Sequence, residues 1–312
     1  MTPSRGRLLL AYITVYVVWG SSYLAIKFAV ESMPAFPMAG ARNLLAGAIL
    51  ILAARLLTQA RGTPAEWKAA AVVGVSLMSS NAAVAFAITR IPSGVASLLT
   101  AMTPCWMVLL EWLRDRRRRP HAGTLAGVVV GLAGIALLVG PAELLGADHI
   151  DPLGAAAVLA GTLVWAAGSL YARTAAKPAS AQMMSGMHML SGGAMLLIVS
   201  SSLGGWSGFD VADVTLRSWF GFAYLVLVAS LAGFTAYVYL LTHASAARAS
   251  TYAFVNPVVA VTLGALFGGE PLTPRVGIAA TVIVGAVALI IVAGSREDLP
   301  AIRDSVAEEP AA

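Results

Sequence analysis

Several aromatic side chains stand inside long apolar stretches, where they could bind an organic molecule by ring stacking and hydrogen bonding. Trp19 lies near the middle of the apolar run Tyr12–Val30, and Trp165 lies near the middle of a similar run ~146 residues later. Because Trp is enriched at the ends of membrane spans, two at mid-depth need an explanation. Either both face a shared cavity and stack on a substrate, or both pack as contacts between helices.

Amide and further aromatic residues extend this candidate set. Asn81 and Asn256 are costly to leave facing lipid, so each must bond to another helix or to a polar group of a ligand. Tyr252 precedes Asn256 by one helical turn and shares its face. Tyr237 alternates with Tyr239, so only one of these two can point inward.

Two prolines predict local breaks in the helices that carry these residues. Pro104 would kink its helix and free a backbone carbonyl close to Trp106, and Met102 precedes Trp106 by one turn. Met102 could line a cavity with an adaptable apolar wall or simply be core. The candidate substrate contacts are Trp19, Asn81, Met102, Trp106, Trp165, Tyr237, Tyr252 and Asn256, with Pro104 and Pro257 as structural pivots.

The ionisable residues are placed unlike those of an ion pump. Lys27 and Glu31 are four residues apart, which predicts an exposed pair on one helix. Glu111 has Arg114 and Asp115 within one turn. His188 could relay protons, but an interhelical hydrogen bond is the favoured interpretation.

No carboxylate is predicted at mid-depth, so the sequence offers no clear proton or sodium site, and a facilitator is as plausible as an antiporter. The sequence also lacks the motifs of metalloproteases and phosphate-binding loops, and Asp148 and His149 are interpreted as solvated loop residues. The single cysteine, Cys105, excludes an intrachain disulfide. We therefore predict no catalytic site, no metal site and no cofactor.

The composition indicates that the helices carrying these residues lie in a membrane. Of the 312 residues 59% are apolar and only 11% are charged, with a mean hydropathy of +0.82, whereas soluble domains carry about 25% charged residues. Gly and Pro interruptions divide the chain into ten apolar spans. These are 9–29, 38–57, 68–88, 94–112, 122–140, 153–173, 181–203, 218–241, 248–267 and 275–294.

The basic residues predict the orientation of these spans. With a cytoplasmic N-terminus, 15 of the 20 Lys and Arg residues fall on the cytoplasmic side, including the run Arg116–Arg119. Both termini are then cytoplasmic, and residues 295–312 are a polar tail expected to be disordered. The partners of this basic charge are lipid phosphates rather than nucleic acid.

The second half of the chain repeats the first. Residues 93–110 align with residues 246–263, which places Pro104 on Pro257, and Gly40 falls on Gly186. Two five-span repeats, 9–140 and 153–294, must be inserted upside-down relative to each other, because five is odd. Inverted repeats favour a binding site near the midplane and alternating access, although duplication could also yield a passive bundle. Gly127, Gly131, Gly134 and Gly285 suit helix packing or dimerisation, and the oligomeric state is left open.

The chain resembles the EamA-type transporters of the drug/metabolite transporter superfamily over nearly all of residues 9–294. The resemblance is carried by the proline-centred segment 256–274, NPVVAVTLGALFGGEPLTP, and the span that follows it. The first repeat departs from this pattern, because Glu111 is followed by RDRRRR after two further residues. The aromatic-rich spans look most like bacterial aromatic amino-acid exporters. The resemblance implies a cavity lined by spans 1, 3, 4, 6, 8 and 9.

The sequence therefore predicts an all-α integral membrane protein of the inner membrane, with ten transmembrane helices in two inverted repeats. Its expected function is the movement of a small amphipathic or aromatic metabolite, amino acid-like or drug-like, most consistent with export. A sugar-phosphate or nucleoside carrier would need inward Lys or Arg at mid-depth, and an enzyme would need convergent titratable groups. A non-transporting membrane scaffold stays open as a third interpretation.

Overall fold

The structure is a computed structural model that describes residues 5–114, 122–139, 150–178, 180–243 and 252–307. Within these ranges all regular secondary structure is helical. The elements are α1 (Arg5–Val30), α2 (Ala35–Thr58), α3 (Pro64–Ile88), α4 (Ser93–Thr100), α5 (Thr103–Arg114), α6 (Ala122–Val139), α7 (Pro152–Thr174), α8 (Ala181–Ser202), the 3-10 turn η2 (Val211–Asp213), α9 (Leu216–Ala223), the π-helix η3 (Tyr224–Ala232), α10 (Gly233–His243), α12 (Tyr252–Phe267) and α13 (Pro274–Ala307).

The helices have the length and composition of membrane spans. In the described ranges seven helical segments are long and apolar enough to cross a bilayer, and three shorter apolar helices lie within 122–138, 255–267 and 274–290. Each of the ten stretches that the sequence marks as apolar contains helix. The chain is therefore an all-helical membrane protein, as predicted.

Helix starts follow local sequence signals. Thr63 caps α3 by accepting a hydrogen bond from the Glu66 amide, while the Glu66 carboxylate accepts one from the Thr63 amide. This reciprocal pair satisfies two amides that the first turn would leave unpaired. Asp151 caps α7 in a similar way, accepting from the amides of Leu153 and Gly154. Pro64 and Pro152 occupy the first helical position, where the missing amide costs nothing.

The fourth span, predicted over 94–112 with a kink at Pro104, is divided into two helices. α4 ends at Thr100 and α5 begins at Thr103, with Pro104 in its first turn. A proline cannot donate to the carbonyl four residues earlier, which here belongs to Thr100. The Thr103 hydroxyl donates to that carbonyl, with Oγ1 2.7 Å from the carbonyl oxygen. The break therefore precedes Pro104 and leaves the freed carbonyl satisfied.

Two other elements differ from expectation. The eighth span is helical from Leu216 to His243, but its middle nine residues form the π-helix η3. α13 continues to Ala307, so residues 295–307 are helical where the sequence analysis expected a disordered tail. Ala, Leu, Arg and Glu in this segment favour helix, which allows the last span to run on past its apolar part.

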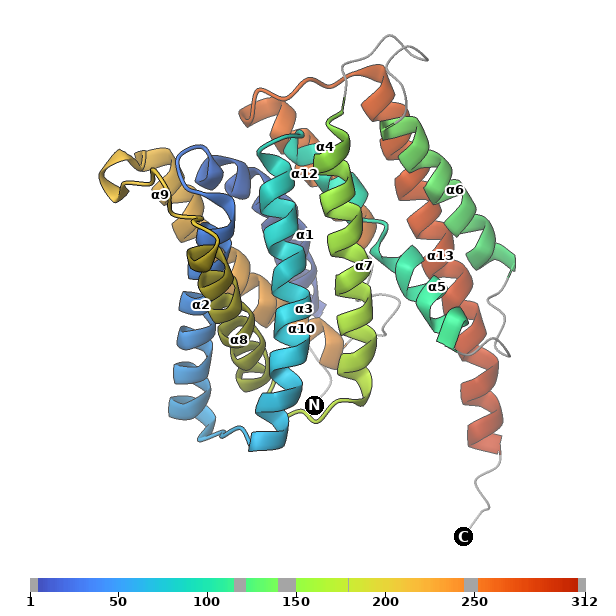
Figure 1. Cartoon of the computed structure of the whole chain (residues 1–312). Coiled ribbons are helices and arrows are strands. Elements are labelled where there is room, and N and C mark those ends of the chain that lie inside the picture. Colours follow the sequence, from blue (N-terminus) through green and yellow to red (C-terminus); the bar gives the residue numbers. More distant parts are fainter. Residues whose placement is uncertain (1–4, 115–121, 140–149, 179, 244–251, 308–312) are drawn as a thin grey trace.

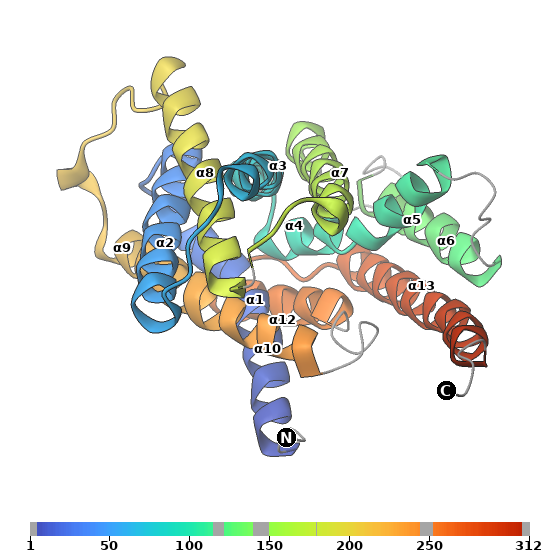
Figure 2. The ribbon, with the colours of Figure 1, turned by 90° about the horizontal axis from the view of Figure 1, so that it is seen from below.

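The helices form a main bundle with one pair beside it. α2 packs against α8, α3 packs against α7 and α8, and α1 packs against α9, α10 and α12. α6 and α13 pair with each other and join the bundle through α5 and α12 (Figures 1 and 2). The start of α1 and the end of α13 lie at the same, lower end of the molecule in Figure 1.

Glycines allow close contact between α2 and α8. Gly193 of α8 abuts Gly40 and Leu44 of α2, and Gly47 of α2 abuts Gly186 and Leu190 of α8. A Cβ at any of these four glycines would lie 2.6–2.9 Å from its nearest neighbour, so small residues permit backbone approach here.

A second glycine-lined contact joins α6 to α13. Gly127 faces Ile290 and Gly134 faces Ile283. Gly131 faces the side chain of Met102. Three of the four glycines noted for packing or dimerisation thus pack within the chain, whereas a Cβ at Gly285 would have no neighbour within 4 Å.

Candidate functional site

Three aromatic rings from both sequence halves meet between α1, α10 and α12. The Trp19 ring centroid lies 4.9 Å from that of Tyr237 and 5.1 Å from that of Tyr252, and the two tyrosine rings are 5.6 Å apart. Edge-to-face and tilted contacts at these distances match the preferred geometry of aromatic pairs. All three side chains are half-buried. We call Trp19, Tyr237 and Tyr252 the aromatic triad.

The backbone around the triad is shaped to admit the Trp19 indole. A Cβ at Gly233 would lie 2.6 Å from Trp19 Nε1, so a glycine is needed for the indole to take this position. Trp19 Nε1 donates to the carbonyl of Ala229 at 3.3 Å. Ala229 belongs to η3, and π-helical segments frequently mark functional sites. The indole is therefore anchored by the irregular part of the eighth span.

Asn256 lies one turn beyond Tyr252 on α12 and carries a buried amide oxygen. The residue is 8% exposed, and its Oδ1 has no hydrogen-bond partner among the residues that the structure describes. Its backbone carbonyl would be 3.3 Å from a Cβ at Gly20, so α1 and α12 cross closely at this point. An unpaired buried carbonyl is expensive, which makes this atom a candidate acceptor for a ligand donor. Pro257 follows inside α12 and removes an amide donor from the same turn.

The other predicted contact residues lie elsewhere in the bundle. Trp106 Nε1 donates to the Thr162 hydroxyl at 3.0 Å, which ties α5 to α7. Met102 is fully buried and packs against Gly131 of α6.

Asn81 and Trp165 also lie apart from the triad. Asn81 Nδ2 lies 3.7 Å from Met78 Sδ on its own helix. Within the described part of the chain, Trp165 makes no hydrogen bond and no ring contact with Trp19. Four of the eight candidates, Trp19, Tyr237, Tyr252 and Asn256, thus lie on the packed helices α1, α10 and α12.

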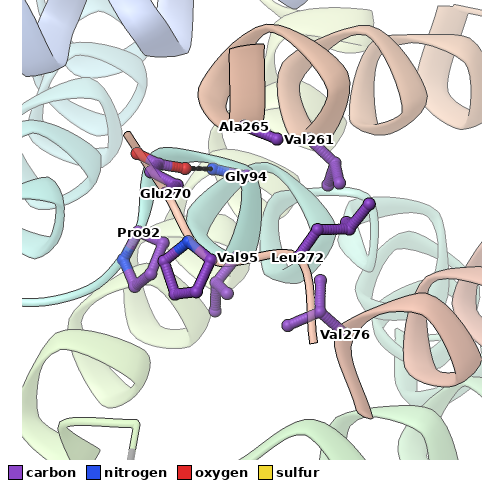
Figure 3. Close-up of a pocket in the computed structure, with 9 residues that line it drawn as sticks. Pro92, Gly94, Val95, Val261, Ala265, Glu270, Leu272 and Val276 are labelled. Atoms are coloured by element: carbon purple, nitrogen blue, oxygen red, sulfur yellow. Dashed lines mark hydrogen bonds between the residues drawn. The ribbon is translucent and has the colours of Figure 1, made fainter. Parts of the chain in front are cut away.

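A second polar cluster, which the sequence analysis missed, surrounds Glu270. Its carboxylate accepts hydrogen bonds at the first turn of α4, from the backbone amide of Ser93 at 2.7 Å and from that of Gly94 at 3.0 Å (the dashed line in Figure 3). Lys27 Nζ lies 3.1 Å from Glu270 Oε1 and donates to the Gly268 carbonyl at 2.5 Å. The Glu270 side chain is 7% exposed. A helix N-terminus and an ammonium group together compensate the buried negative charge.

Glycines direct Glu270 toward α4. Gly269 has φ +63°, and the amides of Gly268 and Glu270 both donate to the Gly264 carbonyl. This left-handed cap ends α12 and turns the chain back over it. A Cβ at Gly264 would lie 2.4 Å from Glu270 Oε2. The Gly-Gly-Glu-Pro sequence by itself does not indicate which distant groups bind the glutamate.

The Lys27–Glu31 pair predicted on one helix is wrong. Lys27 pairs with Glu270, and Glu31 pairs with Arg217 of α9 at 3.2 Å. The spacing of four residues permits a local pair, yet both side chains find partners on other helices. A buried carboxylate gains more from a cation than an exposed one does, since water screens the exposed charge.

The other charged groups of the spans also make tertiary contacts. Glu111 pairs with Arg173 of α7 rather than with its neighbour Arg114, and Asp115 lies outside the described residues. Arg42 Nε donates to Ser230 of η3 at 3.4 Å. The His188 side chain has no hydrogen bond to any described residue, so the expected interhelical bond is absent from this part of the structure.

Outside the spans, Arg90 lies 3.1 Å from Asp151. Its hydrogen bond, with those of the capped amides, holds the pKa of Asp151 below its ordinary value. Among the described residues, no three His, Cys, Asp or Glu side chains gather where they could hold a metal. The expected loop residues Asp148 and His149 fall outside the described ranges.

Helices of membrane-spanning length around an aromatic cluster define a helical membrane protein with a candidate site for an organic molecule. The chain belongs to the EamA-like transporter family, whose family model matches it twice, over residues 6–140 and 152–292. This confirms the resemblance drawn from the sequence, and the chain is a membrane transporter of this family.

Its relatives are inner membrane and efflux proteins. It is 37% identical over 284 residues to the uncharacterized inner membrane transporter YedA of Escherichia coli K12, covering 90% of this chain and 89% of that protein. It is 26% identical over 278 residues to a probable amino-acid metabolite efflux pump of the same organism, covering 83% and 86%. A solved crystal structure at 20% identity shares the fold with a TM-score of 0.61, covering 94% of this chain and 99% of that chain.

Proposed function

We propose that this protein exports a small aromatic or amphipathic metabolite, amino acid-like or drug-like, across the inner membrane by alternating access. The observation that carries the proposal is the aromatic triad, with the unpaired Oδ1 of Asn256 one helical turn beyond Tyr252 on α12. Stacking surfaces and one open acceptor suit a ligand with an apolar body and a polar hydrogen-bond donor. Indole and phenol rings also attract organic cations, so an ammonium group is compatible with this site.

Paired glycine contacts support an arrangement of ten spans in two inverted repeats, 9–140 and 153–294. Gly40 and Gly47 of α2 correspond to Gly186 and Gly193 of α8 in the repeat. Gly40 contacts Gly193, and Gly47 contacts Gly186. Each glycine of α2 therefore contacts the equivalent of the other α2 glycine, which is the pattern expected for two helices related by a twofold axis. The order of the contacts is opposite along the two helices, so the helices are antiparallel. An axis in the membrane plane produces this pattern, as inverted-topology transporters require.

Other helix pairs show the same symmetry: where two helices pack on each other, their equivalents in the other repeat also do. α3 packs on α7, and the equivalent helices, the eighth span and α1, also pack on each other. α1 packs on α12, and its equivalent α7 packs on α4 and α5. The binding site would then lie between the repeats, where α1 of the first meets α10 and α12 of the second.

The basic loops support an orientation with both termini in the cytoplasm, and the efflux pump among the relatives supports export. Impermeant labelling of single cysteines at residue 2 and residue 310 tests the orientation in intact cells. Both are expected to stay unlabelled until the cells are permeabilised. Labelling of one end alone in intact cells would contradict an even number of crossings.

Transport in reconstituted liposomes tests the function directly. Vesicles that contain the protein are loaded with a panel of aromatic and other amino acids and cationic drugs. They are expected to show more flux than loaded vesicles without the protein. Trp19→Ala and Tyr252→Ala should reduce that flux about tenfold, as the loss of one stacking contact predicts. Trp219→Ala, at a half-exposed tryptophan of α9, is the matched control and should leave it unchanged. No flux for any compound would argue against a transporter of this substrate class.

A further inference from the structure

The Glu270 cluster ties together three helix ends that belong to both repeats. Lys27 lies in the last turn of α1 and Ser93 begins α4, both in the first repeat, whereas Glu270 follows α12 in the second. One carboxylate thus accepts from the ammonium group and from two amides of α4. Removing it would release all three contacts together, because no other described side chain bonds to those two amides.

The space beside this cluster is too small for a metabolite. A crevice of about 10 Å³ is lined by Pro92, Gly94, Val95, Val261, Leu272 and Val276 next to the Glu270 side chain (Figure 3). That volume holds about one water molecule. The end of the bundle where α1 ends and α4 begins is therefore closed at this point while Glu270 is in place.

The opposite end carries an ion pair that contains the repeat equivalent of Lys27. Arg173 occupies the position in α7 that corresponds to Lys27 in α1, and it pairs with Glu111 at the end of α5. α1 and α7 are equivalent helices of the two repeats, and their last turns lie at opposite ends of the bundle in Figure 1. The Glu111 side chain is 48% exposed, compared with 7% for Glu270. The two pairs therefore differ in burial as well as in place.

We infer that Lys27, Glu270 and the first turn of α4 form a latch that holds one end of the transport pathway closed, and that Arg173 and Glu111 form its counterpart at the other end. This inference rests on the proposed alternating-access function. Opening at the first end requires the Glu270 carboxylate to leave the α4 amides. The buried latch holds its end shut in the present structure, whereas the exposed pair is more easily broken by water.

Cysteine labelling can test the latch without any knowledge of the substrate. In a Cys105→Ala background, Val95→Cys places one thiol in the crevice, where Val95 is 1% exposed. Purified protein in lipid nanodiscs is treated with a water-soluble maleimide. Glu270→Gln and Lys27→Met should each raise the labelling rate about tenfold, because removal of one latch group shifts the equilibrium toward the open state.

One matched control and one independent test variant make this measurement decisive. Glu31→Gln breaks the ion pair with Arg217 on the same helix end without touching α4, and it should leave the labelling rate unchanged. Lys27→Met keeps the carboxylate cap on α4, so it remains informative if Glu270→Gln fails to fold. Unchanged labelling in Lys27→Met, or an equal rise in Glu31→Gln, would overturn the latch.

The counterpart pair makes an opposite prediction. Adding Arg173→Ala to Lys27→Met should lower the labelling rate again, because a weakened second end favours the state that is closed at the first. A further rise would show that Arg173 and Glu111 are no counterpart. Flux measured on the same proteins separates the two proposals. If Lys27→Met raises the labelling rate but the protein transports no compound, the proposed transport function fails and the latch is retained.

Discussion

At the scale of single residues, the candidate site combines good aromatic packing with one unsatisfied polar atom. The three rings of the triad pack against one another, and the Trp19 indole donates to the Ala229 carbonyl. Asn256 Oδ1, one turn beyond Tyr252 on α12, is buried without a described partner. Leaving a buried carbonyl unpaired costs about 1–3 kcal/mol, and we expect a donor group of the ligand to pair with this one. Stability and transport should therefore respond to this residue in opposite directions.

Replacing Asn256 with Val tests this expectation. Asn256→Val removes the buried polar group, so the free energy of unfolding should stay the same or rise by about 1 kcal/mol. Liposome flux should fall about tenfold, because the ligand loses its acceptor. Thermal unfolding in detergent and flux are measured on the same preparation. A clear drop in the unfolding temperature would mean instead that Asn256 holds α12 against another helix.

At the scale of secondary-structure elements, breaks and caps decide where the helices can bend. The α4–α5 break is set by Pro104, since the proline denies Thr100 its usual donor and Thr103 supplies a substitute. α7 is fixed at its start by Asp151, whose carboxylate caps two amides and pairs with Arg90. The first feature divides the span into two helices, and the second joins the start of α7 to Arg90, just past the end of α3.

Pro104→Ala should join α4 and α5 more closely into one helix. The new amide can donate to the Thr100 carbonyl, so thermal stability should be kept or increased. Flux should decrease several-fold if the break is a pivot of the transport cycle. Pro64→Ala, at the first position of α3, is the control, because a proline there disturbs no helical bond. Unchanged flux in Pro104→Ala would assign the break a packing role only.

Asp151 predicts a pH dependence of stability. Hydrogen bonds from Arg90 and from the capped amides lower the pKa of Asp151 in the folded state below its ordinary value of 3.8. A lowered folded pKa means that the contribution is full above the unfolded value and is lost as the pH falls through the folded one. Asp151→Asn should therefore unfold at a lower temperature than wild type at pH 7.

The difference in unfolding temperature between wild type and Asp151→Asn should shrink below about pH 4, as the native carboxylate is protonated. Asp213→Asn, at an exposed aspartate, supplies the baseline for the general effect of losing a charge. A gap that stays constant from pH 7 to pH 3 would show that the carboxylate charge is not what stabilises the start of α7.

At the scale of the whole molecule, the fold is held by glycine-lined contacts between equivalent helices. α2 crosses α8 through four glycines, and α6 crosses α13 through Gly127 and Gly134. Lipid provides little drive for helices to associate, so close backbone approach and dispersion contacts carry much of this packing. These central contacts are consequently less tolerant of added volume than the outer faces of the same bundle.

Valine substitutions at two glycines measure this difference. Gly186→Val would place its Cβ 2.6 Å from Ile51 and 3.0 Å from the Gly47 carbonyl. Overpacking of this kind should lower the free energy of unfolding by about 1–3 kcal/mol. A Cβ at Gly285 meets no atom within 4 Å, so Gly285→Val is the matched control and should be neutral. Equal losses of stability would mean that the α13 face is covered by a partner.

Much of this architecture was readable from the sequence because it rests on local or periodic signals. The apolar runs predicted the helices, and the Gly and Pro interruptions between them predicted most of the helix ends. The duplicated segments predicted which helices are equivalent. Trp19, Tyr237, Tyr252 and Asn256 were selected because each is costly or unusual within an apolar span, a property of the residue and its place in the chain.

The pairing of charges was decided only by the tertiary structure. Lys27 has Glu31 at helical spacing but binds Glu270, 243 residues away, and Glu111 passes over Arg114 for Arg173. The composition, the helices and the repeat follow from the sequence by itself, since backbone hydrogen bonds and transfer into lipid act on each segment separately. The aromatic triad, the π-helix and the Glu270 cluster required the packed bundle, because their energies depend on which distant groups are brought within a few ångströms and shielded from water.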